Sequence, residues 1–154
     1  MVANVYFSIG SNLGDTYTNL NTAIALLEER VGVLVKKSEY LVTKPWGKTD
    51  QNDFLNAALW FKTTLSPHEV LSVIQDIETQ MGRIRQEKWG ERLIDIDIVL
   101  MDDYVLNDTL LTIPHPFLHE RLFVLMPLCQ LNPDLIHPVL KVTLNQLLHN
   151  VQNA

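Results

Sequence analysis

The chain has 154 residues, of which 47% are hydrophobic and 19% charged, and a formal net charge of −6, so we expect one globular domain over residues 1–154. The acidic balance argues against binding to nucleic acid or an anionic membrane, because such binding neutralises many phosphates. The single cysteine excludes an intrachain disulfide, no apolar run reaches the ~18 residues of a membrane span, and the N-terminus lacks a basic signal segment, which together favour a cytoplasmic protein.

The first half of the chain predicts one helix and three strands. Apolar residues recur at helical spacing over about 16–31, and Gly32 supplies the stop. The predicted strands are rich in β-branched and aromatic residues and cover residues 2–9, 33–42 and 54–63. Turn-forming residues at 10–15 and a long polar loop over 43–53 join these elements.

A second helix begins at a capping box, because Ser66 can cap the first turn, Pro67 fits its first position and Glu69 completes the box. Its apolar face runs to Met81, and Gly82 ends it. A charged loop over 83–92 then leads to a fourth strand over 93–101.

The order β-α-β-β-α-β with right-handed crossovers predicts an α+β fold, the ferredoxin-like sandwich of an antiparallel sheet with two helices on one face. The remaining third is expected to be an extension, with a short strand pair near 104–112 and short helices near 117–121 and 143–149. This fold hosts many functions, so the function must be argued from the side chains.

Two carboxylates, Asp95 and Asp97, lie two residues apart on the fourth predicted strand and therefore share a face. Ile94, Ile96 and Ile98 would fill the core face. Adjacent carboxylates repel unless a cation or an arginine joins them, and hard divalent cations prefer such oxygens. The alternative interpretation is the solvated outer face of an ordinary amphipathic strand.

Three of the five arginines, Arg83, Arg85 and Arg92, precede this strand within ten residues. Guanidinium groups bind phosphate oxygens in a bidentate manner, so a basic loop beside two carboxylates suits a nucleoside triphosphate with Mg²⁺. A solvated loop paired with Glu87 and Glu91 explains the same charges equally well.

Further candidates carry weaker signals. Two prolines restrict the backbone at His115, which could donate to a phosphate or complete a turn. Phe54 and Asn56 share a face where the long loop meets the sheet, and a ring beside a carboxamide suits a flat heterocycle. Spacing alone favours core roles for both. Trp89 either covers a nucleotide or anchors its loop.

Together, seven short motifs resemble one family, that of 6-hydroxymethyl-7,8-dihydropterin pyrophosphokinase in folate biosynthesis. Each is weak alone, but their order and spacing over about residues 5–138 are specific. The motifs are Gly10-Ser11-Asn12-Leu13-Gly14-Asp15, Pro45-Trp46-Gly47, Asp53-Phe54-Leu55-Asn56-Ala57-Ala58, Gly82-Arg83-Ile84-Arg85, Lys88-Trp89-Gly90, Arg92-Leu93-Ile94-Asp95-Ile96-Asp97-Ile98 and Ile113-Pro114-His115-Pro116.

The resemblance implies that pyrophosphate moves from MgATP to the hydroxymethyl group of the pterin, releasing AMP. It implies two Mg²⁺ ions on Asp95 and Asp97, with Arg83 and Arg92 steadying the triphosphate. The implied pterin site comprises Thr43, Pro45, Trp46, Phe54, Asn56 and Phe123. The implied ATP site comprises Glu78, Arg85, Trp89, Ile98, Thr112, His115 and Arg121.

One departure from the family concerns Leu110, which stands where some members carry an arginine before Thr112. The expected partners are the two small-molecule substrates, with the chain acting as a monomer. Two other classes compete with the enzyme. A regulatory module on the same fold would not need both carboxylates and the arginine-rich loop, and the net charge of −6 argues against an RNA-binding sheet.

Overall fold

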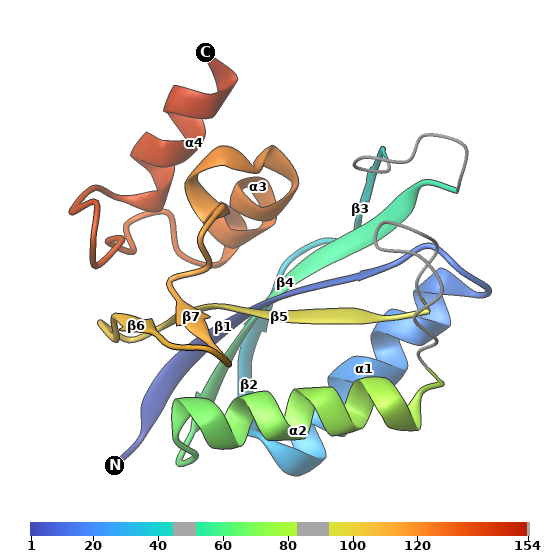
Figure 1. Ribbon diagram of the computed structural model, residues 1–154. Coiled ribbons are helices and arrows are strands. Elements are labelled where there is room, and N and C mark those ends of the chain that lie inside the picture. Colours follow the sequence, from blue (N-terminus) through green and yellow to red (C-terminus); the bar gives the residue numbers. More distant parts are fainter. Residues whose placement is uncertain (45–51, 83–92, 154) are drawn as a thin grey trace.

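A five-stranded antiparallel sheet forms the centre of the protein in the computed structural model, which describes residues 1–44, 52–82 and 93–153 (Figure 1). The strand order is β2-β4-β1-β5, with the short β3 also paired to β4. The strands are β1 (Ala3–Ser11), β2 (Gly32–Lys37), β3 (Leu41–Thr43), β4 (Phe54–Thr63) and β5 (Asp95–Met101). This order is that of the predicted ferredoxin-like sandwich.

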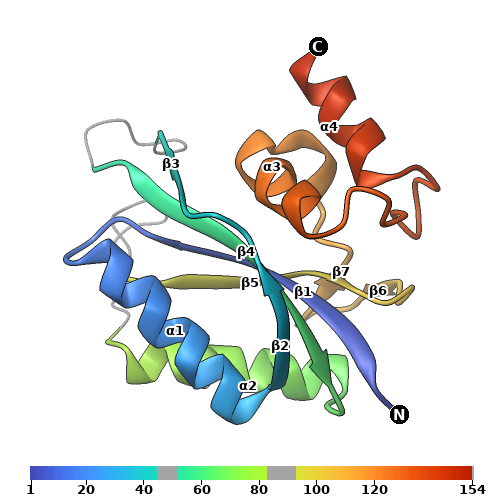
Figure 2. The ribbon, with the colours of Figure 1, turned by 180° about the vertical axis from the view of Figure 1, so that it is seen from behind.

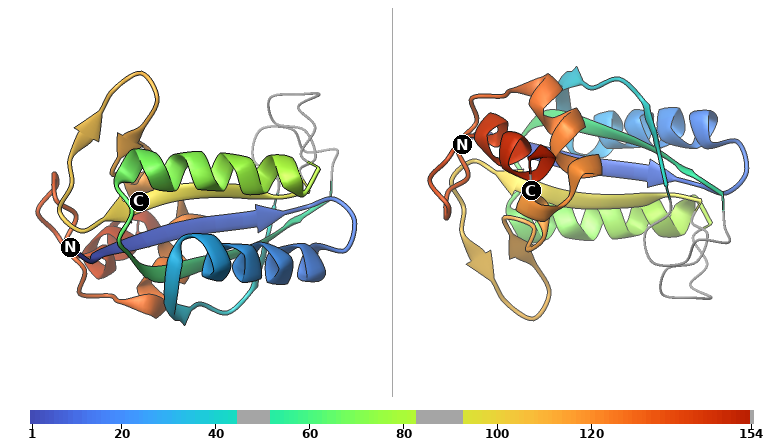
Figure 3. Two further views of the ribbon diagram at one scale, coloured as in Figure 1. Left: turned by 90° about the horizontal axis from the view of Figure 1, so that it is seen from below. Right: turned by 90° about the horizontal axis from the view of Figure 1, so that it is seen from above.

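Two helices, α1 (Thr16–Arg30) and α2 (Pro67–Gln80), cover one face of the sheet (Figure 1). Seen from below, they run side by side across it (Figure 3). The predicted capping box is confirmed, since Ser66 accepts from Glu69 and the Glu69 carboxylate accepts from the Ser66 backbone. Asp15 caps α1 by accepting the N–H of Thr18, which the sequence prediction did not identify.

The C-terminal third consists of the hairpin strands β6 (Leu106–Asn107) and β7 (Thr112–Ile113), the 3₁₀ turn η1 (Leu118–Glu120), α3 (Leu122–Leu131) and α4 (Leu144–Gln152). Helices α3 and α4 cover the opposite face of the sheet, as the view from behind shows (Figure 2). The hairpin instead contributes Leu111 and Ile113 to the core on the α1/α2 side. No helix in the described ranges is long and apolar enough to cross a membrane.

Each face of the sheet has its own apolar core. Alternate residues of β1 show the division, because Phe7 and Ile9 pack against α1 and α2, whereas Tyr6 packs against α3 and α4. On β5, Ile96 and Ile98 are buried on the α1/α2 face, as predicted from strand alternation. On the other face, Asp95 and Asp97 occupy the start of β5, whereas Val99 and Leu100 at its end join the α3/α4 core.

The predicted strand over 33–42 is wrong in one respect, because the structure divides it into β2 and β3. Ser38, which is 6% exposed, lies between them. Its N–H donates to the Ala58 carbonyl, and its hydroxyl accepts the Ala58 N–H. The next residue, Glu39, donates its N–H to the Gln130 side chain instead of to a strand.

The extension also contains more helix than predicted. The predicted elements near 104–112, 117–121 and 143–149 correspond to the β6–β7 hairpin, η1 and α4. The ten-residue helix α3 was not predicted. Its sequence is apolar on almost every side and contains Pro127, so it shows neither the alternation of a helix face nor an uninterrupted helical composition.

Candidate active site

One row of paired residues crosses the sheet on the face opposite α1 and α2. In this row Asp95 of β5 pairs with Gly10 of β1, which pairs with Asn56 of β4, which pairs with Leu41 of β3. In the neighbouring row, Asp97 pairs with Ser8. Strand register therefore sets the two carboxylates and the carboxamide on one face, separated by the width of β1.

The carboxylate pair is partly accessible, since Asp95 is half-buried and Asp97 is exposed. Both project away from the core because Ile96 between them is buried. Within the described ranges, no group of three His, Cys, Asp or Glu side chains is arranged to hold a metal ion. Two carboxylates alone suit a hard cation that takes its remaining ligands from phosphate oxygens and water, as Mg²⁺ commonly does.

A third carboxylate, that of Glu78, lies at the same strand. It stands near the C-terminal end of α2 and is 6% exposed. Its Oε2 accepts the backbone N–H of Ile96 at 2.9 Å. Glu78 thus fastens α2 to β5 at the residue between the two aspartates.

The carboxamide of Asn56 is buried at 5% exposure, and its Nδ2 donates to the Thr43 hydroxyl on β3. Phe54 lies two residues earlier on the same face and pairs with Thr43 across the strands. The structure therefore brings together Thr43, Phe54 and Asn56, as the resemblance implied.

Phe123 lies in the first turn of α3, which begins at Leu122 and packs on this face of the sheet over β4. Arg121 precedes it, with its guanidinium carbon 5.7 Å from the centroid of the Phe123 ring and 5.2 Å from that of Phe117. Stacking between two rings orients the flat guanidinium group. Phe54 thus belongs to the sheet, and Phe123 belongs to the helix that packs over this face of it.

His115 follows the β6–β7 hairpin and is held to β5 by its N–H, which donates to the Val99 carbonyl at 2.9 Å. Burial, together with the nearby Arg121 charge, lowers the pKa of His115 to about 4. Its Nδ1 accepts the N–H of Phe117 at 3.2 Å. The neutral ring therefore carries its proton on Nε2 and can donate it to an anion.

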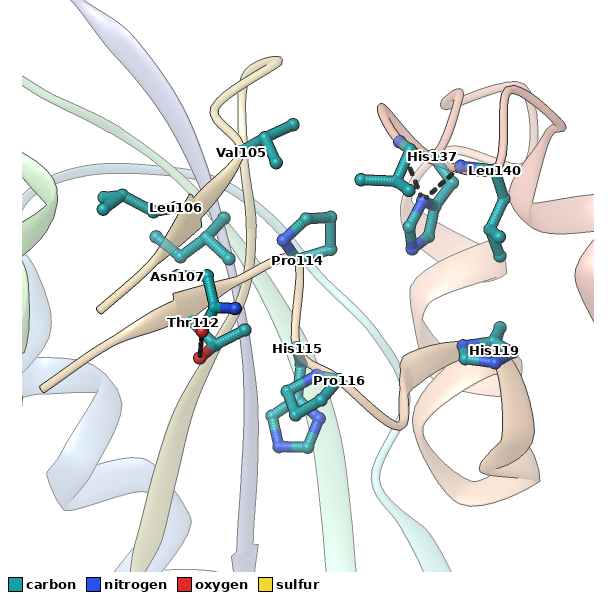
Figure 4. A pocket seen from close by; sticks show the side chains of 12 residues that line it. Val105, Leu106, Asn107, Thr112, Pro114, His115, Pro116, His119, His137 and Leu140 are labelled. Atoms are coloured by element: carbon teal, nitrogen blue, oxygen red, sulfur yellow. Dashed lines mark hydrogen bonds between the residues drawn. The ribbon is translucent and has the colours of Figure 1, made fainter. Parts of the chain in front are cut away.

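A cavity of about 260 Å³ lies between the β6–β7 hairpin and the loop before α4 (Figure 4). Thr112 and His115 form part of one wall, and His119 and His137 form part of the other. His137 accepts the N–H groups of Val139 and Leu140 at its Nδ1 and so shapes the loop. The Thr112 hydroxyl donates to the Asn107 side chain at 3.3 Å.

Six of the predicted site residues lie outside the described ranges, namely Pro45, Trp46, Arg83, Arg85, Trp89 and Arg92. Ile98 is described, but its side chain is buried in the core under α1 and α2.

Sequence reasoning treated Gly10 as part of a turn. Only the register that sets it between Asp95 and Asn56 identifies it as part of this face.

Comparison with protein families supplies a match over residues 6–133, to the model described as 7,8-dihydro-6-hydroxymethylpterin-pyrophosphokinase (HPPK). The chain belongs to the HPPK family. The match includes both aspartates, the Asn56 face and His115. The family suggested by the seven sequence motifs is thereby confirmed.

Three bacterial relatives share the name 2-amino-4-hydroxy-6-hydroxymethyldihydropteridine pyrophosphokinase. That of Methylorubrum extorquens is 42% identical over 136 residues, which are 88% of this chain and 86% of the relative. That of Aquifex aeolicus is 42% identical over 145 residues, or 94% and 90%. That of Bacillus subtilis is 44% identical over 127 residues, or 82% and 76%.

Solved structures of HPPK-DHPS from Plasmodium falciparum share the fold. The wild type with pterin and p-hydroxybenzoate superposes with a TM-score of 0.83 at 20% identity, and the wild type with pteroate with a TM-score of 0.80 at 18%. Each match covers 97% of this HPPK-family chain but 43% and 42%, respectively, of the Plasmodium chains. These matches confirm the α+β fold.

Proposed function

We propose that this chain transfers pyrophosphate from ATP to the hydroxymethyl group of 6-hydroxymethyl-7,8-dihydropterin, releasing AMP, as a step of folate biosynthesis. The observation that carries the proposal is the HPPK family match over residues 6–133, which spans the row from Asp95 to Asn56. The pterin hydroxyl attacks the β-phosphorus of ATP and a new P–O bond forms there. The bond from that phosphorus to the oxygen bridging it to the α-phosphate breaks with AMP as leaving group, and the hydroxyl proton passes to water.

Asp95 and Asp97 are the proposed metal ligands, and we propose two Mg²⁺ ions. Magnesium, when bound, offsets the charge of the triphosphate and links its oxygens to the protein. By holding these ions, the two carboxylates would keep the triphosphate against β5. Arg83 and Arg92, which precede β5 in the chain, are proposed to bind phosphate oxygens and stabilise the charge that develops during transfer.

The pterin is proposed to bind on the other side of Gly10. Asn56 can exchange hydrogen bonds with the amide edge of the ring, because a carboxamide offers both a donor and an acceptor. Phe54 and Phe123 would stack against its two faces. Thr43 keeps Asn56 oriented by accepting from its Nδ2, and Pro45 and Trp46 complete the proposed site.

ATP is proposed to contact His115 and Arg121. The neutral His115 donates from Nε2 to a phosphate oxygen, since its Nδ1 is occupied by the Phe117 N–H. Arg121 contributes its charge. The remaining proposed contacts are Glu78, Arg85, Trp89, Ile98 and Thr112, with Ile98 acting through its backbone because its side chain is buried.

The chain requires no macromolecular partner for this chemistry, and we propose that it acts in the cytoplasm as a monomer with its two substrates. AMP formation from ATP, Mg²⁺ and 6-hydroxymethyl-7,8-dihydropterin tests the function. AMP is expected only when pterin and metal are both present, and none after omission of pterin or addition of EDTA. ADP in its place would mean attack at the γ-phosphorus. No turnover by folded protein that binds ATP would favour a regulatory module.

A further inference from the structure

The closest approach on the proposed substrate face lies between the backbone of Gly10 and the side chain of Asn56. A Cβ added at Gly10 would stand 2.6 Å from Oδ1 of Asn56, and 3.6 Å from both the Leu55 carbonyl oxygen and Cδ1 of Phe54. A separation of 2.6 Å between a methyl carbon and an oxygen is shorter than van der Waals contact allows. Any side chain at position 10 must therefore displace Asn56.

The Asn56 side chain has little freedom to move away from position 10. It is 5% exposed, and its Nδ2 donates to the Thr43 hydroxyl. A rotation that moved Oδ1 away from position 10 would also move Nδ2 and break that bond. The next side chain that a Cβ would meet is Phe54, at the distance of an ordinary van der Waals contact, so the clash falls on Asn56 alone.

We infer that Gly10 is a positioning residue for pterin recognition, because its missing side chain lets the Asn56 carboxamide approach the backbone of β1. This inference rests on the proposed function. Gly10 also separates the two halves of the site, since it pairs with Asp95 on one side and Asn56 on the other. Neighbouring strands lie about 4.8 Å apart, so the backbones of Asn56 and Asp95 stand roughly 10 Å apart across β1.

The nearest atoms to a Cβ at position 10 belong to β4, and none belongs to Asp95. A substitution at Gly10 should therefore affect the pterin site and spare the ATP site. Gly10→Ala is expected to weaken pterin binding tenfold or more, while the KM for ATP stays within twofold of the wild-type value. A general loss of stability would lower the amount of active enzyme and leave both KM values unchanged.

The test measures pterin affinity in two ways, by steady-state KM and by equilibrium titration of 6-hydroxymethyl-7,8-dihydropterin fluorescence with a non-hydrolysable ATP analogue and Mg²⁺ present. The variants are Gly10→Ala, Asn56→Ala and the double variant. If Gly10 acts through Asn56, adding Gly10→Ala to Asn56→Ala produces no further loss of affinity. Ile24→Val, a core change on the opposite face, controls for lowered stability and is expected to keep both KM values.

Wild-type pterin affinity in Gly10→Ala overturns the inference, and so do fully additive losses in the double variant. If Gly10→Ala does not fold, the double variant decides, because removing Oδ1 removes the clash. Recovery of a folded protein supports the contact, and continued failure to fold overturns it. A wild type that binds pterin but forms no AMP refutes the proposed function alone, since the titration still tests Gly10. A wild type that binds no pterin refutes both.

Discussion

The carboxylate of Glu78 accepts the backbone N–H of Ile96 at 2.9 Å, at the residue that separates Asp95 from Asp97. Glu78 is 6% exposed and lies near the C-terminal end of α2, where the helix dipole disfavours an acidic group. Its fixed contact with β5 gives it a defined structural task, which is to hold the strand that carries the aspartates.

Glu78→Ala is expected to lower the free energy of unfolding by about 1–3 kcal/mol, because the buried Ile96 N–H loses its acceptor. Glu78→Gln keeps an acceptor oxygen and should remain closer to the wild type. Denaturant unfolding of the two variants measures this difference. Equal stability of Glu78→Ala and Glu78→Gln would show that the hydrogen bond to Ile96 contributes nothing.

Asp95→Ala and Asp97→Ala should each reduce AMP formation roughly 100-fold or more, since each removes a proposed metal ligand. The fold should survive, because neither side chain belongs to either apolar core. Rate measurements across a Mg²⁺ titration, with circular dichroism as the fold control, check both statements. Asp103→Ala, at an exposed position beyond β5, is the matched control, and full activity in either site variant would refute the metal assignment.

The elements predicted well from the sequence are those with strong local signals. The strand over 54–63 matches β4 residue for residue, and the capping box at Ser66 forms as expected. The division of β2 from β3 depends instead on Ser38 meeting Ala58, 20 residues away. The helix α3 is buried by both α4 and the sheet, so tertiary packing stabilises a segment without a helical pattern of its own.

The same distinction holds for the site. Strand alternation was enough to set Asp95 and Asp97 on one face and Ile96 in the core. Their position relative to Asn56 depends on the register of three strands, because a slip of one residue would turn either group to the other face. Local spacing holds no information on that register, so the sequence motif that contains Gly10 did not reveal its position between Asp95 and Asn56.

His115 predicts a specific pH dependence of stability. Its pKa in the folded protein is about 4, below the ordinary value of 6.5, so the unfolded chain takes up this proton first as the pH falls. The resulting contribution to stability is complete above pH 6.5 and is lost as the pH drops towards 4. The Tm of the wild type should therefore fall more steeply from pH 7 to 4 than that of His115→Asn, in which an amide oxygen replaces Nδ1 as acceptor.

Scanning calorimetry at several pH values measures the two slopes. Carboxylates that titrate in the same range affect both proteins equally, so only the difference between them reports His115. Parallel curves for wild type and His115→Asn would mean that His115 is protonated equally readily in the folded and unfolded chains.

Asp108 fixes the turn of the β6–β7 hairpin and joins it to α2. Its Oδ1 accepts the N–H groups of Leu110 and Leu111 at 2.9 and 2.8 Å, and its Oδ2 lies 2.8 Å from Nε2 of His68. The turn leads directly into Thr112, the first residue of β7 and a proposed ATP contact. Asp108→Ala is expected to raise the KM for ATP several-fold and leave the KM for pterin unchanged, because the turn loses both its internal bonds and its link to α2.

Two milder variants separate these contributions. Asp108→Asn keeps an oxygen for the two N–H groups, and His68→Ala removes only the link to α2, so each should raise the KM for ATP less than Asp108→Ala does. Steady-state kinetics with each substrate varied in turn make the comparison. An effect of His68→Ala as large as that of Asp108→Ala would mean that the link to α2, and not the turn itself, orients the hairpin. An unchanged KM for ATP in all three variants would show that the hairpin turn does not contribute to nucleotide binding.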